Sequence, residues 1–176
     1  LDYCIGFDRV FYDRVLNNEK ITLFSYHEVP ELWNRFGFPD FKDLYLAAEK
    51  NTKLKFKKTM NARDLFMLFS KERVETGRIY VMNVDHANSH GSWLEQVDTS
   101  NLCLEVNHPL IPITDLNDKN GEIGVCILSA VNLLKVDEDE MEPVCDVIVR
   151  MLEELIDHQN YFVPAAENFA KRRRSL

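Results

Sequence analysis

The spacing of apolar side chains predicts helices in both the first and the last third of the chain. Apolar residues recur at intervals of three and four, the period of an amphipathic helix, most regularly from Val144 to Ile156. Acidic residues from Asp137 to Glu142 precede that helix, where negative charge suits the positive end of the helix dipole. Helices are predicted over residues 7–16, 31–36, 41–50, 60–75 and 144–156, followed by a last helix that begins near Pro164.

The pattern changes to that of extended structure in the middle of the chain. Strands are predicted for residues 21–24 and 78–84, a short strand or extended loop for 102–106, and a buried strand for 122–134. The polar stretch from Asp85 to Thr99 is predicted to be a loop, and Asn120-Gly121 a turn that uses positive φ. Helices around a few buried strands indicate an α/β layer arrangement. So few strands cannot close a barrel by themselves.

Composition and charge narrow the functional class. The chain has 176 residues and a formal net charge of −8, which argues against a nucleic-acid-binding domain. No apolar run approaches the roughly 20 residues that a membrane span needs. The four cysteines lack C-x-x-C spacing and are too sparse for a disulfide scaffold, which favours a reducing, cytoplasmic setting. Because the sequence starts with Leu1 and stops without a helix terminator, we expect a piece of something longer.

Three features have a structural and a functional interpretation. His86 and His90 would share a helix face as metal ligands do, but the polar residues around them favour simple loop packing. The basic run from Lys171 to Arg174 is interpreted as a solvated helix end, with an anion-binding or localisation patch as the alternative. Cys4 and Cys145 are interpreted as small core residues.

The stretch from Ser100 to Val106 has a more unusual pattern. If it is extended, the amide of Asn101, the thiol of Cys103 and the carboxylate of Glu105 point to one side, because side chains alternate along a strand. Such a trio can hold a polyol by hydrogen bonds. A carboxylate beside a thiol opposes thiolate formation, so the pattern suits a neutral thiol that gives up a hydrogen atom. The alternative is a strand with a polar outer face.

The segment Ser100-Asn101-Leu102-Cys103-Leu104-Glu105 resembles the N-x-C-x-E motif of the large (alpha) chain of class I ribonucleoside-diphosphate reductase. Further matches in the same order and spacing extend the resemblance over essentially the whole chain. They are Asp2-Tyr3-Cys4, Ile21-Thr22-Leu23-Phe24-Ser25, Gly77-Arg78-Ile79-Tyr80, Asn83-Val84-Asp85-His86, Asn120-Gly121-Glu122-Ile123, Cys126, Leu128-Ser129-Ala130, Asn132-Leu133, Pro164-Ala165-Ala166 and Arg173-Arg174-Ser175-Leu176.

The resemblance implies an α/β fold in which residues 1–176 are the central part of the family's ten-stranded barrel, not closed within this segment. It implies that Cys103 is the radical cysteine, whose thiyl radical abstracts the 3′ hydrogen of a bound ribonucleotide. Asn101, Leu102 and Glu105 would bind the substrate, with Glu105 as the base on the 3′ hydroxyl and Asn101 assisting. Cys126 would be one member of the redox pair that reduces the 2′ position, and its partner is expected N-terminal to this segment.

The resemblance also implies partners for deoxyribonucleotide synthesis. These are a ribonucleoside diphosphate substrate, the rest of the large chain, a second large subunit, thioredoxin or glutaredoxin, and a small (beta) subunit whose metallocofactor supplies the radical. No metal or cofactor is expected within this segment, ATP and dNTP effectors are expected to bind outside it, and neither DNA nor a membrane is an expected partner. The alternative is a split-gene or remnant fragment that is inactive alone and acts only by assembly with complementary fragments. A helical acidic scaffold without a site would leave the ordered motifs unexplained.

Overall fold

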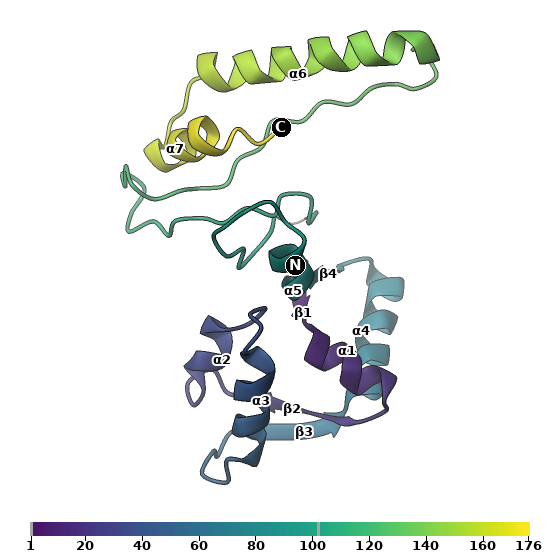
Figure 1. Cartoon of the computed structure of the whole chain (residues 1–176), viewed down its shortest axis with the longest axis vertical. Helices are drawn as coiled ribbons and strands as arrows, with labels where there is room; N and C mark the ends of the chain where they lie inside the picture. The colour runs from purple at the N-terminus through teal and green to yellow at the C-terminus, as the bar shows by residue number, and fades with distance from the viewer. Residues whose placement is uncertain (1, 102) are drawn as a thin grey trace. The chain divides into compact units, whose positions relative to one another are not determined.

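The computed structural model describes residues 2–101 and 103–176, in two compact units that divide between Asn107 and His108 (Figure 1). Leu102, which the family resemblance places among the substrate-binding residues, lies outside the described residues. None of the described helices is long and apolar enough to span a membrane. The first unit contains, in order, β1 (Tyr3–Phe7), α1 (Arg9–Leu16), β2 (Lys20–Phe24), α2 (Pro30–Asn34), α3 (Phe41–Lys50), β3 (Lys57–Asn61), α4 (Ala62–Thr76), β4 (Ile79–Asn83) and α5 (Val84–Ser89).

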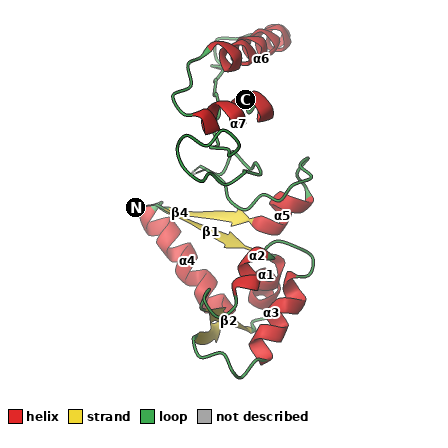
Figure 2. Ribbon diagram, turned by 90° about the vertical axis from the view of Figure 1, so that its left-hand side faces the viewer, coloured by secondary structure: helices red, strands yellow, loops and turns green. Residues whose placement is uncertain are grey.

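The strands of this unit form two separate pairs, drawn as yellow arrows in Figure 2. β1 runs parallel to β4, with Tyr3 opposite Ile79, and β2 runs antiparallel to β3, with Lys20 opposite Asn61. A parallel pair needs a long crossover, and the helices α1, α3 and α4 lie within it. The described residues therefore combine helices and strands as predicted, without a closed sheet.

A hydrophobic core holds α1, α3 and α4 against the strands. Phe7 and Phe11 stack with their ring centroids 4.4 Å apart at its centre. Side-chain caps start the helices, since the Asp8 carboxylate accepts from the Phe11 amide and the Asn61 side chain accepts from the amides at the start of α4. The buried members of this core are Phe7, Val10, Phe11, Ile21, Val29, Leu32, Phe41, Tyr45, Ala48, Ala62 and Leu65.

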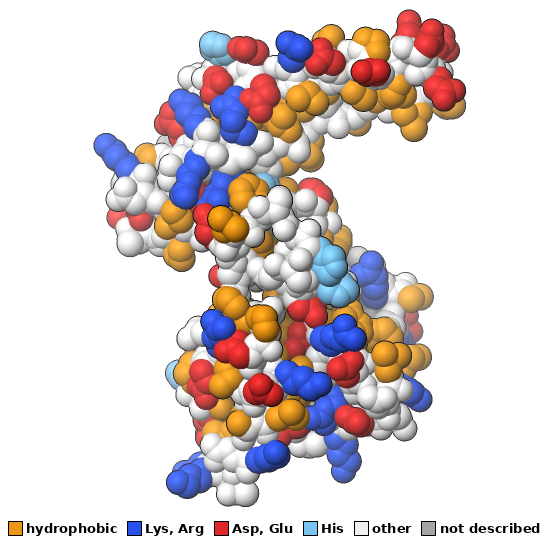
Figure 3. Space-filling view, in the orientation of Figure 1, with side chains coloured by type: hydrophobic (Ala, Val, Ile, Leu, Met, Phe, Trp, Pro, Cys, Tyr) orange, Lys and Arg blue, Asp and Glu red, His pale blue; other side chains and the backbone are white. Residues whose placement is uncertain are grey.

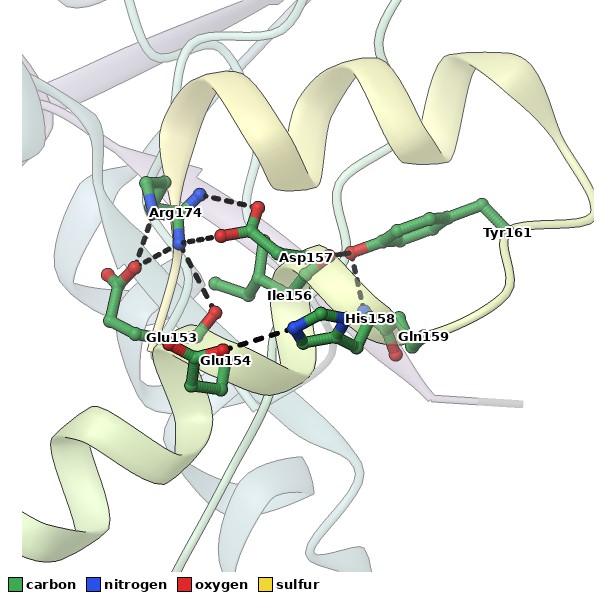
Figure 4. Close-up of polar contacts among 8 residues, drawn as sticks. All are labelled: Glu153, Glu154, Ile156, Asp157, His158, Gln159, Tyr161 and Arg174. Carbon is green, nitrogen blue, oxygen red and sulfur yellow. Dashed lines mark hydrogen bonds and ion pairs between the residues drawn. The ribbon is translucent and has the colours of Figure 1, made fainter.

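The second unit has no strand among its residues 108–176. It contains a 3₁₀ turn at Glu138–Glu140, α6 (Met141–His158) and α7 (Pro164–Arg173), after an irregular stretch. Arg174, just beyond α7, points between Glu153 and Asp157 of α6 and bonds to both carboxylates (Figure 4). Both helices are where the apolar spacing predicts them.

The apolar face of α6 is only partly covered within this unit. Leu152 and Ile156 are buried, whereas Val147 is 64% exposed and Met151 is 50% exposed. Apolar side chains of this helix are visible at the surface in Figure 3. The sequence pattern therefore identifies the helix correctly but overstates how much of its face is buried here.

Several sequence predictions about local structure were wrong. Residues 122–134 are irregular. The Ile123 amide donates to the Ala165 carbonyl of α7 at 3.1 Å and the Ile127 amide to the Ser175 carbonyl near the chain end at 3.3 Å, rather than to a strand. The segment predicted as a loop begins with α5, and β1 and β3 were not predicted. Gly121 does not use positive φ; a Cβ there would lie 2.7 Å from Ile113, so close packing explains the glycine.

The predicted environments of three other features were also wrong. Cys4 and Cys145 are exposed rather than in the core, since Cys4 lies on a two-stranded sheet and Cys145 on the uncovered part of α6. The basic end of α7 is not simply a solvated face, because the Arg173 side chain is 6% exposed and pairs with Glu122.

Candidate functional site

The described residues between Ser100 and Asn107 form a tight loop rather than a strand. The Asn101 side-chain oxygen accepts from the Val106 amide at 3.0 Å, and the Asn101 carbonyl accepts from the Leu104 amide at 3.2 Å. The Ser100 hydroxyl bonds to the Val106 carbonyl at 2.8 Å, and the Asn107 side chain donates to the Leu104 carbonyl at 2.9 Å. These bonds close the loop on itself and hold Cys103 near its tip.

Leu104 has a backbone conformation that is uncommon for a side chain with a Cβ. Its φ is +67°, in the left-handed region, which costs about 1–2 kcal/mol for a residue other than glycine. Its side chain is half-buried and packs against a small hydrophobic cluster of Met82, Val84 and Val97. The packing holds the strained backbone in place directly after Cys103, and strain of this kind is typical of functional loops.

The three candidate side chains are all exposed, and that of Asn101 is also hydrogen-bonded within the loop. Asn101, Cys103 and Glu105 are exposed, and they alternate with the half-buried Leu104 and Val106. The side-chain oxygen of Asn101 is occupied within the loop, so only its NH₂ group is left to donate to a ligand. The exposed positions are those that the spacing places on one side of the segment, although the backbone is a turn rather than extended.

An aromatic-lined pocket of about 660 Å³ opens in the same unit beside the start of this loop. Asp98, Thr99 and Ser100 form its polar side, and Ser100 is adjacent to Asn101 in the sequence. Cys4 also lines the pocket, and burial raises the pKa of its thiol. Its apolar lining includes Leu23, Phe24, Tyr26, Val29, Leu32, Trp33, Phe36, Phe41, Tyr45, Met82 and Val84.

Cys126 lies in the second unit, in an irregular segment fixed at both ends. On one side Ile123 bonds to α7, and on the other the Ile127 amide donates to the Ser175 carbonyl at 3.3 Å. Glu122, whose side chain is 0% exposed, anchors the start of this segment through Arg172 and Arg173. The Cys126 thiol is half-buried and contacts the Ile127 carbonyl at 3.9 Å.

Sequence reasoning missed two residues that hold these segments. Asn88 on α5 bonds to the backbone of Val97, ahead of the Cys103 loop, and Glu122 fixes the Cys126 segment. Asn88 stands in a polar stretch that gives no sign of its partner. Glu122 could have been noticed as a charged residue before an apolar run.

His86 and His90 lie at the end of α5 with their ring centroids 5.0 Å apart. Among the described residues, no group of three or more His, Cys, Asp or Glu side chains could hold a metal ion. The two imidazoles are a surface pair, with His86 on α5 and His90 directly after its end, so His86 is not in the loop that the sequence indicates.

Comparison with known proteins places the chain in a family. Residues 1–176 match the family model described as ribonucleotide reductase, barrel domain. The chain belongs to this ribonucleotide reductase family. Its resemblance to the reductase large chain, inferred from the motifs, is thereby confirmed.

Curated relatives agree with this assignment over the whole chain. The ribonucleoside-diphosphate reductase subunit alpha of Buchnera aphidicola subsp. Schizaphis graminum is 45% identical over 100% of the chain and 24% of the relative. The subunit alpha of Haemophilus influenzae is 43% identical and that of Enterobacteria phage T4 is 40% identical, with the same shares covered. The chain therefore spans about a quarter of the length of these curated relatives.

Proposed function

We propose that this chain carries the radical cysteine of a ribonucleoside-diphosphate reductase large subunit, and that Cys103 is that cysteine. The observation that carries the proposal is the exposed Cys103 thiol on a closed, strained loop, with Asn101 and Glu105 exposed on either side. The names of the relatives support the reaction, since each is called a ribonucleoside-diphosphate reductase.

The proposed chemistry uses each side chain for one task. The Cys103 thiyl radical takes the 3′ hydrogen of the ribose, while Glu105 accepts the proton of the 3′ hydroxyl and Asn101 donates a hydrogen bond from its NH₂ group. The 2′ hydroxyl takes a proton from the redox thiol pair and leaves as water. Cys126 and a second thiol together supply that proton, a hydrogen atom for the 2′ carbon and one electron, and become a disulfide, while Glu105 returns its proton to the 3′ oxygen. Cys103 then returns the hydrogen atom to the 3′ carbon.

The proposal extends to the assembly in which the chain works. The strand pairs would be part of a ten-stranded α/β barrel completed by the rest of the large chain. A second large subunit, a small (beta) subunit with the radical-generating metallocofactor, and thioredoxin or glutaredoxin would be partners, and ATP or dNTP effectors would bind elsewhere. The four cysteines are free, which suits the reducing cytoplasm.

The test is Cys103→Ser in the complete large subunit, assayed with its small subunit for deoxyribonucleotide formation. We expect turnover to be abolished, because a serine hydroxyl does not form the radical. Cys145→Ser is the matched control, since Cys145 is likewise an exposed thiol, lies on α6 and has no proposed role. Full activity of Cys103→Ser would refute the assignment.

Cys126→Ser tests the redox role separately. We expect it to block steady-state turnover and to leave ribonucleotide binding intact, because the half-buried thiol would supply electrons rather than hold substrate. Unchanged steady-state rates would contradict that role.

A second candidate is a fragment that acts only by assembly with complementary chains. The exposed apolar side chains favour it, including Leu134 at 93% and Phe162 at 97% exposed. The intact mass of the native polypeptide separates the two. A mass several times that of these 176 residues supports the complete subunit, and a mass equal to theirs supports the fragment.

A further inference from the structure

We propose that Asn88 is a positioning residue for Cys103: its side chain fixes the base of the loop that carries the thiol. This inference rests on the proposed role of Cys103. Asn88 belongs to α5, and the loop begins about ten residues later, so the connection is made by hydrogen bonds and packing rather than by adjacency in the sequence.

The Asn88 amide uses both of its ends on backbone groups. Its oxygen accepts from the Val97 amide at 2.8 Å, and its nitrogen donates to the Val97 carbonyl at 2.9 Å. The same nitrogen donates to the Val84 carbonyl, one turn back on α5, at 2.8 Å. The side chain thus pairs with Val97 as a neighbouring strand would, and it ties Val97 to the helix.

Val97 lies three residues before Ser100, where the loop begins. It is 1% exposed and lies in the cluster with Met82, 6% exposed, and Val84, 3% exposed. Leu104, on the other side of Cys103, packs against this cluster. The chain therefore packs against the same small hydrophobic cluster before and after Cys103, and Asn88 fixes Val97, the cluster residue that precedes the loop.

Leu104 needs the packing of this cluster because its backbone is in the left-handed region, with φ +67°. Without tight anchoring, this residue would relax toward an ordinary conformation and turn the neighbouring Cys103 away. The reacting sulfur must lie close to the hydrogen that it removes, and a misplacement of about 1 Å can cost about 100-fold in rate. A residue that fixes the loop without touching substrate can therefore affect turnover.

Asn88→Asp is the sharpest variant. It keeps the size of the side chain and the oxygen that accepts from Val97, but it replaces the donor to two carbonyls with a second oxygen. Asn51→Asp is the matched control, because the exposed Asn51 side chain only accepts from the Lys53 amide, and an aspartate can do the same.

The experiment uses the complete large subunit with its small subunit and measures two quantities. The first is kcat for deoxyribonucleotide formation. The second is the rate at which iodoacetamide alkylates each cysteine, followed by peptide mapping, with Cys4, Cys126 and Cys145 as internal references. For Asn88→Asp we expect kcat to fall at least about tenfold. We expect the alkylation rate of the exposed Cys103 to change at least about threefold in either direction, with the other three cysteines unchanged, because the loop opens locally and the surroundings of the thiol change.

The other outcomes are each decisive. A rise at all four cysteines together would show general destabilisation and overturn the proposal, as would unchanged kcat. If Asn88→Asp does not fold, Leu104→Ala removes the second anchor of the loop, and unchanged kcat and Cys103 alkylation in that variant would overturn the proposal. An active Cys103→Ser enzyme would refute the proposed function instead, and the alkylation pattern would still report whether Asn88 fixes the loop.

Discussion

Replacing Glu122 with glutamine should loosen the segment that carries Cys126. The Glu122 side chain is 0% exposed, and its oxygens bond to Arg172 at 3.0 Å, to Arg173 at 3.2 Å and to the Ile111 amide at 3.2 Å. Glutamine has nearly the same shape, but it removes the negative charge and turns an NH₂ group toward groups that are themselves donors.

The size of the loss of stability depends on how buried the two arginines are that lose the Glu122 carboxylate. Arg173 is 6% exposed and would lose the carboxylate of Glu122, and breaking one side of a buried pair typically costs about 3–5 kcal/mol. Arg172 is 47% exposed and can turn to water, so the low end, about 3 kcal/mol, applies. The matched control is Glu167→Gln. Glu167 and Lys171 are each nearly half exposed, and the loss of stability there should be small because exposed ion pairs contribute little.

Hydrogen exchange is the suitable assay, because both tryptophans, Trp33 and Trp93, lie in the first unit and fluorescence would report only on that unit. A loss of about 3 kcal/mol predicts roughly 100-fold faster exchange of the Ile123 and Ile127 amides. Exchange no faster than in Glu167→Gln would refute the reasoning.

Three further predictions concern stability. Tyr45→Phe leaves the buried N–H and C=O of Thr22 without their shared hydroxyl partner and should cost about 2–3 kcal/mol, read from urea unfolding by fluorescence. Backbone hydrogen bonds, led by that from the Asn120 amide, lower the pKa of Asp118 from 3.8 to about 2. The turn that contains Asp118 should therefore lose stability as the pH falls from about 4 through 2, and NMR shifts of its amides should show this loss. Burial lowers the pKa of His108 below 6.5. The unfolded chain therefore binds the proton at a higher pH than the folded chain, so the free energy of unfolding should fall as the pH drops below about 6.5. The variant His108→Gln should show a weaker pH dependence of the free energy of unfolding in urea titrations.

Local patterns predicted the elements that depend least on distant partners. The apolar face of α3 gave its bounds, and α6 and α7 followed from their spacing and from Pro164. By contrast, β1 is a short run of strand-favouring residues interrupted by Gly6, and β3 begins with Lys57-Lys58, a residue type that is depleted in strands. Both are strands because of the partners they pair with, which single stretches of sequence do not specify.

The candidate site likewise has features that the local sequence predicted and features that depend on distant parts of the chain. The motif identified Asn101, Cys103 and Glu105 by their types and spacing, and the structure leaves all three exposed. It did not indicate the turn, because a leucine such as Leu104 ordinarily disfavours positive φ. The role of Asn88 was equally hidden, since it depends on which backbone groups come within reach of its amide.

The parallel pairing of β1 and β4 has a consequence for synthesis. Tyr3 has its partner in Ile79, roughly 75 residues later in the chain. At a translation rate of about 5–20 residues per second, β1 therefore leaves the ribosome roughly 4–15 s before β4 exists. Meanwhile α1, β2, α3, β3 and α4 can gather around their own core, with β1 as an unpaired edge that invites association with other nascent chains. Pausing or chaperone binding before Ile79 should therefore affect the yield of this fold more than the same event after Asn83.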